Sequence, residues 1–337
     1  MKSKIFSALK TLFFFGIGIL LIWLVVKNLT EEQKEQIVKA FKEADYLWVI
    51  ITIGLGILSN ISRAVRWKML LAPLGHDPKL FNTFSAVMIG YLANLAVPRL
   101  GEISRCGVLT KYEKIPFTQS FGTVITERII DLLTLMILFV LALILEYEKI
   151  YYYASSRLIE PLKTKLSGGH TLLYLLIVAV AGIAGVIWLS RRKTNTTSVF
   201  SRIIAFIKGF LDGVKSIRNI KNPLLFVFHS VFIWSMYFLS AYLCLFCFPE
   251  TSSLSLSATL VLFVFSGVAV IVTPGGIGAY QIIVAEIMSL YAVSLPIGYA
   301  YGWIGWLGQV FNIVLTALIC LIFLPIKNKG DRFQTGS

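Results

Sequence analysis

The sequence predicts an all-α integral membrane protein with about six full transmembrane helices and two broken re-entrant helical pairs, arranged as inverted repeats. Composition is the first reason: 57% of the 337 residues are hydrophobic and 14% are charged, whereas a water-soluble domain carries about 25% charged residues. The apolar residues also gather in stretches close to the roughly 20 residues that a helix needs to cross a bilayer. Finally, two apolar regions are interrupted by proline and glycine. These observations exclude a soluble two-domain enzyme.

Six continuous apolar runs predict full transmembrane spans, at 9–27, 47–62, 129–146, 171–190, 223–248 and 300–325. The first run follows a basic start, a pattern that also describes a secretory signal peptide. No small-x-small cleavage pattern follows it, and a charged segment, 31–45, comes next. We therefore expect the first run to be a retained membrane span.

The two interrupted regions, 80–127 and 255–292, are predicted to be re-entrant. Cytoplasmic loops of membrane proteins carry an excess of Lys and Arg, and the amino end, the 63–79 and 191–222 connectors and the carboxyl-terminal tail are basic. All four basic segments can lie in the cytoplasm only if each interrupted region enters and leaves the membrane on the same side. The sequence therefore predicts a multi-pass protein of the cell inner or plasma membrane with both termini in the cytoplasm.

The whole chain, 1–337, is interpreted as a single polytopic membrane domain. Its first half covers about 47–146 and its second half about 223–325, and one broken region in each half is the signature of inverted repeats. In both broken regions two glycines eleven residues apart flank a proline: Gly90, Pro98 and Gly101 in the first, and Gly267, Pro274 and Gly278 in the second. Between the halves, 199–220 has an apolar and a basic helical face, which predicts a cytoplasmic interfacial helix.

The densest group of polar residues begins in the first interrupted region and comprises Asn94, Pro98, Arg99, Gly101, Glu102, Arg105, Glu127, Arg128 and Asp131. Charged side chains in the bilayer interior cost at least about 2.5 kcal/mol each, so they persist when they are paired or face a polar cavity. The Pro98 break leaves a helix amino end near Gly101, which attracts anions. Arg99 and Arg105 beside it are candidates to hold a phosphate by forked hydrogen bonds. The alternative is a purely structural ion network.

Two further groups of residues are candidates for the same site. Arg63 and Arg66 end the second predicted span, where they either anchor the helix at the cytoplasmic interface or also contact a headgroup. The second break offers backbone N–H groups to a phosphate through Pro274, Gly275, Gly276, Gly278 and Gln281. It is not a nucleotide-binding loop, because the GxxxxGK[ST] pattern is absent. Its alternative role is to break the helix and nothing more.

Four motifs, in this order, resemble the flippase-like membrane region of the lysylphosphatidylglycerol synthase family: RxxRW from Arg63, NLAVPRLGEISR from Asn94, ERIID from Glu127 and PGGIGAYQ from Pro274. The resemblance covers nearly the whole chain. In two-part members, a cytoplasmic aminoacyl-transferase domain makes the modified lipid and the membrane region moves it to the outer leaflet. Only a short tail follows the last predicted span, so the resemblance implies a stand-alone lipid translocator. Family members often have Glu at the position of Gln281, which argues against a cationic-headgroup role there.

We therefore expect a lipid flippase that moves an anionic phospholipid or a polyprenyl-phosphate-linked lipid between leaflets. In this hypothesis Arg99 and Arg105 hold the phosphate, and the residues that orient them are Glu102, Glu127, Arg128 and Asp131. The alternatives are a membrane enzyme that acts on a lipid phosphate, with Glu102 or Asp131 as base, and a scaffold without transport activity.

No cofactor, metal or catalytic residue is predicted. The sequence contains no ATP-binding motif and no paired-acid metal motif, and its three histidines lie in different segments. Cys244 and Cys247 lie within an apolar run, where packing is their expected role. The expected partners are lipids with phosphate headgroups and either a second copy of the chain or a separate lipid-modifying enzyme. No nucleic acid is expected, because the basic residues lie in the connectors.

Overall fold

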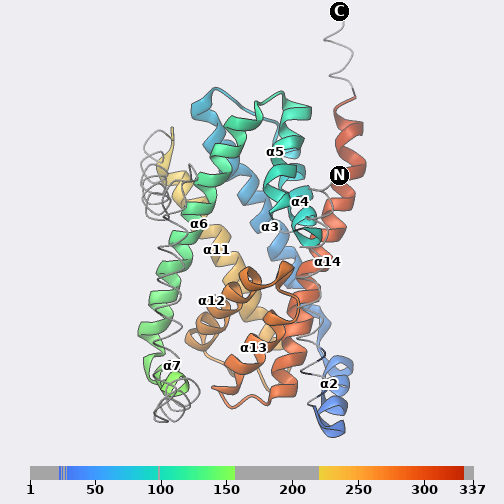
Figure 1. Ribbon diagram of the computed structural model, residues 1–337, viewed down its shortest axis with the longest axis vertical. Helices are drawn as coiled ribbons and strands as arrows, with labels where there is room; N and C mark the ends of the chain where they lie inside the picture. Colours follow the sequence, from blue (N-terminus) through green and yellow to red (C-terminus); the bar gives the residue numbers. More distant parts are fainter. Residues whose placement is uncertain are drawn as a thin grey trace, which may run out of the picture.

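The computed structural model describes Trp23, Val25, Lys27 and the ranges 29–97, 99–155 and 220–329, and each regular element in these ranges is a helix (Figure 1). Four helices are long and apolar enough to cross a membrane: α3 (Tyr46–Leu71), α6 (Phe117–Leu145), α11 (Pro223–Cys244) and α14 (Leu295–Lys327). Together with the shorter apolar helices they confirm the predicted all-α membrane fold. The predicted spans 9–27 and 171–190 and the linker 199–220 lie outside the described residues, apart from Trp23, Val25, Lys27 and Ile220.

The shorter elements lie between and beside these four helices. They are α2 (Glu31–Glu43), α4 (Leu80–Ala96), α5 (Leu100–Glu113), α7 (Tyr147–Ala154), α12 (Leu256–Val272) and α13 (Ala279–Ser289). Three 3-10 turns complete the described ranges: η1 (Ala72–Leu74), η4 (Leu245–Cys247) and η5 (Pro274–Gly276). None of α4, α5, α12 and α13 reaches the roughly 20 residues needed to cross hydrocarbon.

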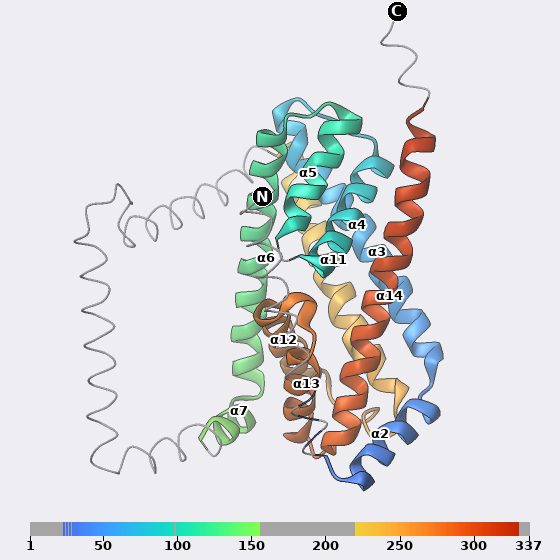
Figure 2. The same ribbon diagram turned by 45° about the vertical axis from the view of Figure 1, so that its right-hand side comes forward.

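The four short helices form two hairpins that enter the bundle from opposite ends, as Figures 1 and 2 show. The α4–α5 hairpin turns back at Val97–Arg99 and the α12–α13 hairpin turns back at Thr273–Gly278, both near the middle of the molecule. Their tips meet, since the Cβ position of Gly275 lies 3.4 Å from Leu95 Cδ2. α14 packs against both hairpins. Two opposed hairpins are the arrangement expected of inverted repeats.

Two helix boundaries differ from the sequence prediction. The first re-entrant pair ends at Glu113 instead of extending to residue 127, and α6 begins at Phe117, directly after Pro116. Proline disfavours helix in the residue before it, so the chain turns there and then continues as one long helix. Glu127 therefore lies on a crossing helix, as the sequence predicts for Asp131, and not in the re-entrant region.

α3 also continues beyond its predicted end. The prediction ended the span at residue 62, before the first charged side chain, whereas α3 runs to Leu71. Arg63 and Arg66 consequently lie inside the helix and are 4% and 0% exposed. The prediction that they anchor the helix at the membrane interface was therefore wrong, because neighbouring helices cover both side chains.

Close backbone contact holds α4 and α5 together near their tip. The Cβ position of Gly90 lies 2.9 Å from the carbonyl oxygen of Gly101, and the Cβ position of Gly101 is closer still to the carbonyl oxygen of Gly90. The Gly101 N–H donates to Asn94 Oδ1 at 2.7 Å, which caps one of the exposed donors at the start of α5. Only glycine fits the space at both positions. The spacing of the two glycines around Pro98 therefore follows from the close packing of α4 and α5. Pro98 itself lies outside the described residues.

The two ends of the bundle differ in charge. Lysines predominate at the helix ends on the side where the α4–α5 hairpin opens: Lys68, Lys79, Lys111, Lys114, Lys327 and Lys329. The opposite end, with α2 and α7, carries more acidic than basic side chains among the described residues. By the positive-inside rule the lysine-rich end faces the cytoplasm, and this orientation stays a prediction.

The glycine contact predicts a difference between two substitutions on α5. Gly101→Ala should lower the thermal stability of the detergent-solubilised protein by about 1–3 kcal/mol, because the added methyl group forces α4 and α5 apart. Gly107→Ala, at an exposed position with nothing within 4 Å of its Cβ, should be neutral or stabilising by up to about 1 kcal/mol, since alanine favours helix. Equal melting temperatures for the two variants would contradict the proposed packing.

Candidate functional site

Glu127 is the centre of the site. It lies on α6 and its side chain is completely buried. Its Oε1 accepts hydrogen bonds from Arg63 Nη1 at 2.7 Å and Arg105 Nη1 at 3.2 Å, and its Oε2 accepts one from Arg105 Nη2 at 2.9 Å. The Arg105 pair is bidentate, a geometry that the planar guanidinium favours. One carboxylate thus joins α3, α5 and α6.

Asp131 extends the network by one helical turn. Its Oδ2 accepts from Arg63 Nη1 and its Oδ1 from Arg66 Nη2, both at 2.7 Å. Arg66 Nη1 donates to Ser230 Oγ on α11 at 3.2 Å. The Glu127 cluster, defined here as Arg63, Arg66, Arg105, Glu127 and Asp131, therefore connects four helices.

An aromatic ring covers part of the cluster. The guanidinium carbon of Arg105 lies 3.8 Å from the centre of the Trp67 ring, within the range of a cation–π contact. Trp67 is fully buried, and its indole N–H donates to Thr123 Oγ1 at 2.9 Å. This contact fixes the ring and so positions Arg105.

The Glu127 cluster contains more positive than negative charges. It contains three arginines and two carboxylates, so one positive charge has no acidic partner within it. The Nε atoms of all three arginines are buried and without a hydrogen-bond partner among the described residues. Burying a charge without an opposite charge is costly. The cluster therefore keeps a net positive charge inside the bundle.

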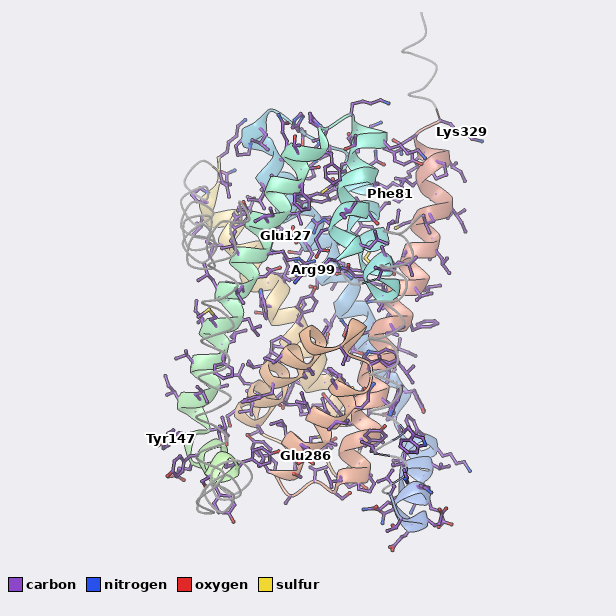
Figure 3. All side chains as sticks on the ribbon, in the orientation of Figure 1. Phe81, Arg99, Glu127, Tyr147, Glu286 and Lys329 are labelled. Carbon is purple, nitrogen blue, oxygen red and sulfur yellow. The ribbon has the colours of Figure 1, made fainter. Side chains whose placement is uncertain are left out.

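A second group of charges leads from the cluster to the hairpin tip. Arg128, next to Glu127, donates to Glu102 Oε1 of α5 at 3.0 Å, and its side chain is 42% exposed. Arg99 occupies the N-cap position of α5 in the left-handed conformation, with φ of 67°, and its side chain is exposed. It has no acidic partner among the described residues. Figure 3 shows Arg99 and Glu127 at about the same height, near the middle of the molecule.

The backbone groups at the second break find hydrogen-bond partners on the protein itself. Gly275, Gly276 and Gly278 have φ values of 64°, 79° and 79°, which favour glycine. The Gly278 N–H donates to Gln281 Oε1 at 2.8 Å, and Trp306 Nε1 donates to the Gly275 carbonyl oxygen at 2.6 Å. Gln281 is fully buried. These contacts give the break a helix-breaking and capping role, and headgroup binding by its residues stays a prediction.

The structure joins five of the predicted site residues in the Glu127 cluster and two more in the Arg128–Glu102 pair, but with different partners from those expected. Arg105 was expected to hold phosphate beside Arg99, whereas both of its terminal nitrogens bind Glu127. Arg63 and Arg66 belong to the centre of the network and not to its edge. Sequence reasoning missed Thr123 and Ser230. The only sequence signal for Ser230 is a hydroxyl inside an apolar span, and Ser230 is 164 positions from its partner Arg66.

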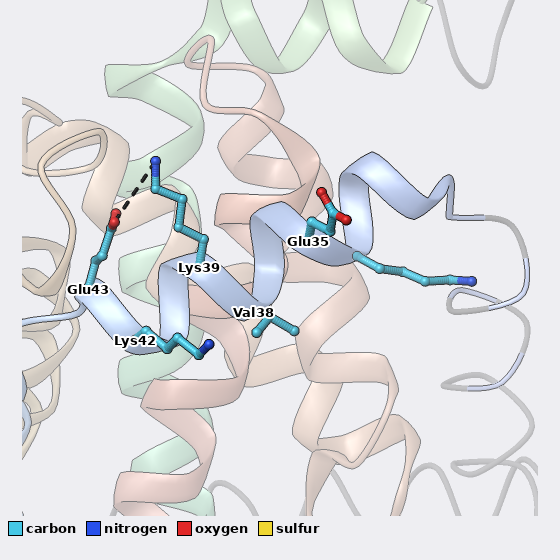
Figure 4. A pocket seen from close by; sticks show the side chains of 6 residues that line it. Glu35, Val38, Lys39, Lys42 and Glu43 are labelled. Carbon is cyan, nitrogen blue, oxygen red and sulfur yellow. Dashed lines mark ion pairs between the residues drawn. The ribbon is translucent and has the colours of Figure 1, made fainter.

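The other candidate features lie elsewhere or are buried in the core. A pocket of about 430 Å³ lies on the surface of α2, at the opposite end of the bundle (Figure 4), and is lined by Lys34, Glu35, Val38, Lys39, Lys42 and Glu43. Cys244 and Cys247 are buried in the hydrophobic core. The described ranges contain no group of three or more His, Cys, Asp or Glu residues that could hold a metal ion.

Comparison with known proteins agrees with the motifs. A family model described as lysylphosphatidylglycerol synthase TM region matches residues 8–304. The chain belongs to this family. The lysylphosphatidylglycerol synthase TM region therefore includes both hairpins and the whole Glu127 cluster, and the recognition based on four short motifs is confirmed.

Two curated relatives are similar to this family member. The UPF0104 membrane protein MJ1595 of Methanocaldococcus jannaschii is 24% identical over 319 residues, which cover 88% of this chain and 90% of that protein. The glycosyltransferase AglD of Haloferax volcanii is 28% identical over 101 residues, which cover 30% of this chain and 16% of that protein. No solved structure matches the chain.

The cluster predicts a large loss of stability when its central carboxylate is neutralised. Glu127→Gln removes the charge that pairs with Arg63 and Arg105; Arg63 keeps Asp131, but the buried Arg105 guanidinium loses its acidic partner, which should destabilise the protein by about 3–5 kcal/mol. Thermal unfolding in detergent measures this change.

Glu35→Gln provides the matched control, because Glu35 lies on the exposed surface of α2. Its effect should stay within about 0.5 kcal/mol. If both glutamine variants unfolded at the same temperature as the parent protein, the cluster would not hold the four helices together.

Proposed function

We propose that this protein translocates a lipid with an anionic phosphate headgroup between the two leaflets. The observation that carries the proposal is the excess of arginine over carboxylate in a buried cluster that continues to the exposed Arg99 at the hairpin tip. Charged groups at membrane depth are rare and commonly line a substrate pathway. A phosphate is the lipid group that guanidinium binds most specifically.

The opposed hairpins supply the access that translocation requires. Broken helices that meet at the membrane midplane place their exposed helix ends at a substrate site, and movement of one repeat against the other exposes that site to each side in turn. Here the α4–α5 tip carries the charges and the α12–α13 tip is the opposing surface. In this mechanism the headgroup occupies the region between the tips while the acyl chains stay in lipid.

Each charged group has a distinct role in this proposal. Arg99, at the amino end of α5, makes the first contact with phosphate, because its side chain is exposed and has no acidic partner among the described residues. Arg128 exchanges Glu102 for the phosphate as access changes. The Glu127 cluster remains intact and attracts the headgroup through its uncompensated charge. Arg105 thus acts at a distance and not by direct contact.

An enzymatic role receives less support from this geometry. A general base must have a free oxygen within reach of the proton that it removes. Glu127 and Asp131 already accept short hydrogen bonds from arginines on both of their oxygens. Glu102 pairs with Arg128 through Oε1, and its Oε2, which has no hydrogen-bond partner among the described residues, is buried away from solvent. We therefore propose transport in place of lipid chemistry.

A translocation assay tests the proposal. The purified protein is reconstituted in liposomes that contain phosphatidylglycerol with a fluorescent acyl chain, and an added quencher that cannot cross the membrane reports how much label reaches the outer leaflet. The parent protein should make the inner-leaflet label accessible faster than protein-free vesicles do. Arg99→Gln should slow this rate about tenfold, because it removes a charge that contacts phosphate.

Lys111→Gln is the control for this variant. It removes the same charge from the same helix, about 18 Å from Arg99 at 1.5 Å per residue, and Lys111 is likewise exposed. Its rate should stay near that of the parent protein. Translocation at the protein-free rate with every labelled anionic lipid would refute a transport function.

A further inference from the structure

The number of uncompensated charges at the site is two. The Glu127 cluster carries one positive charge in excess, and Arg99 carries another. The remaining pair, Arg128 with Glu102, is neutral. Aromatic rings do not supply the missing negative charges: the faces of Trp67, Tyr237 and Phe226 lie 3.8–6.0 Å from guanidinium groups, and such contacts are weaker than a formal ion pair.

The two charges lie close enough to act on one headgroup. Arg99, at the N-cap of α5, lies six residues before Arg105, the member of the Glu127 cluster on the same helix, which corresponds to about 9 Å along the helix. Charges at this separation still interact appreciably where the surroundings are less polar than water. The amino end of α5, which points to the same tip, adds a partial positive charge. A ligand at the tip therefore feels more than a single positive charge.

The backbone at the tip supports a role for Arg99 in ligand binding. At the other break, positive φ values occur at glycines, whereas at this break an arginine adopts φ of 67°. A non-glycine residue in this conformation is strained by about 1 kcal/mol or more, and such strain is concentrated at functional sites. The strained residue at this tip is also the one that carries an unpaired, exposed charge.

We infer that the site selects a lipid whose headgroup carries two negative charges on phosphate, such as a phosphomonoester or a diphosphate ester, over a phosphodiester with one negative charge. This inference rests on the proposed function and adds the substrate class. Two charges on the ligand neutralise both the buried excess and Arg99, whereas a phosphodiester leaves one of them uncompensated. A phosphomonoester reaches a charge of about −1.5 to −2 at neutral pH, with its second pKa near 6.

The experiment compares two lipids in the same liposome assay. Phosphatidic acid, a phosphomonoester, and phosphatidylglycerol, a phosphodiester, carry identical acyl chains and the same fluorescent label on one chain, so that both headgroups stay unmodified. Rates are measured at pH 7.5 and pH 5, and the rate in protein-free vesicles is subtracted for each lipid and pH. At pH 7.5 phosphatidic acid should move about tenfold faster, which corresponds to one additional charge interaction.

Arg99 variants identify the source of the selectivity. Arg99→Gln should reduce the ratio of the two rates to near one, whereas Arg99→Lys, which keeps the charge, and Lys111→Gln, which lies away from the tip, should preserve it. Lowering the pH to 5 removes most of the second charge of phosphatidic acid and should bring its rate close to that of phosphatidylglycerol.

The outcomes separate this inference from the proposed function. If phosphatidylglycerol moved as fast as phosphatidic acid at pH 7.5, the two-charge selectivity would be wrong while lipid transport stood. If the ratio survived Arg99→Gln, the inference that Arg99 supplies the second charge would be wrong. If neither lipid moved faster than in protein-free vesicles, the proposed function itself would fail.

Discussion

The pairing of Glu127 with Arg63 and Arg105 is the interaction on which the rest of the site depends. A fully buried carboxylate could not remain charged in this position without its arginines, and the arginines could not remain buried without it. Because the three side chains come from α3, α5 and α6, their pairing also decides how the α4–α5 hairpin is seated against the crossing helices. Asp131 and Ser230 continue the same network to α11.

This constraint explains why the hairpin is built as it is. Residues Gly90 and Gly101 let α4 and α5 approach closely, and that approach brings Arg105 to the depth of Glu127. The same short turn leaves Arg99 at the tip with no acidic partner among the described residues. One part of the hairpin, the paired charge in its interior, therefore stabilises the fold. Another part, the unpaired charge at its end, serves the proposed function.

The two hairpins show similar shape with different chemistry. Both are short helical pairs that turn near the middle of the bundle, yet the α12–α13 turn is lined by glycines and capped by the buried Gln281. The α4–α5 turn instead presents charge. In the proposed mechanism the headgroup interacts mainly with one half of the protein, and the other half forms a neutral surface that moves against it.

The sequence by itself determined the membrane class, the two broken regions and the set of polar residues near membrane depth. These properties follow from local composition, since apolar run length and the conformational limits of proline and glycine act over a few neighbouring residues. The family could also be recognised from four short motifs. The glycine spacing around Pro98 was interpreted only as a sign of inverted repeats, and its packing role appeared in the structure.

Only the tertiary structure decided which charges are paired. Arg63 and Glu127 are 64 positions apart and Arg66 and Ser230 are 164 apart, and contacts of this kind depend on how each helix is rotated and how deeply it lies. The end of α3 was misplaced for the same reason: an arginine looks like a helix boundary until a carboxylate from another helix neutralises it. The physical difference is that a local pattern shows that a charge needs a partner, while the packing of distant helices decides which partner it has.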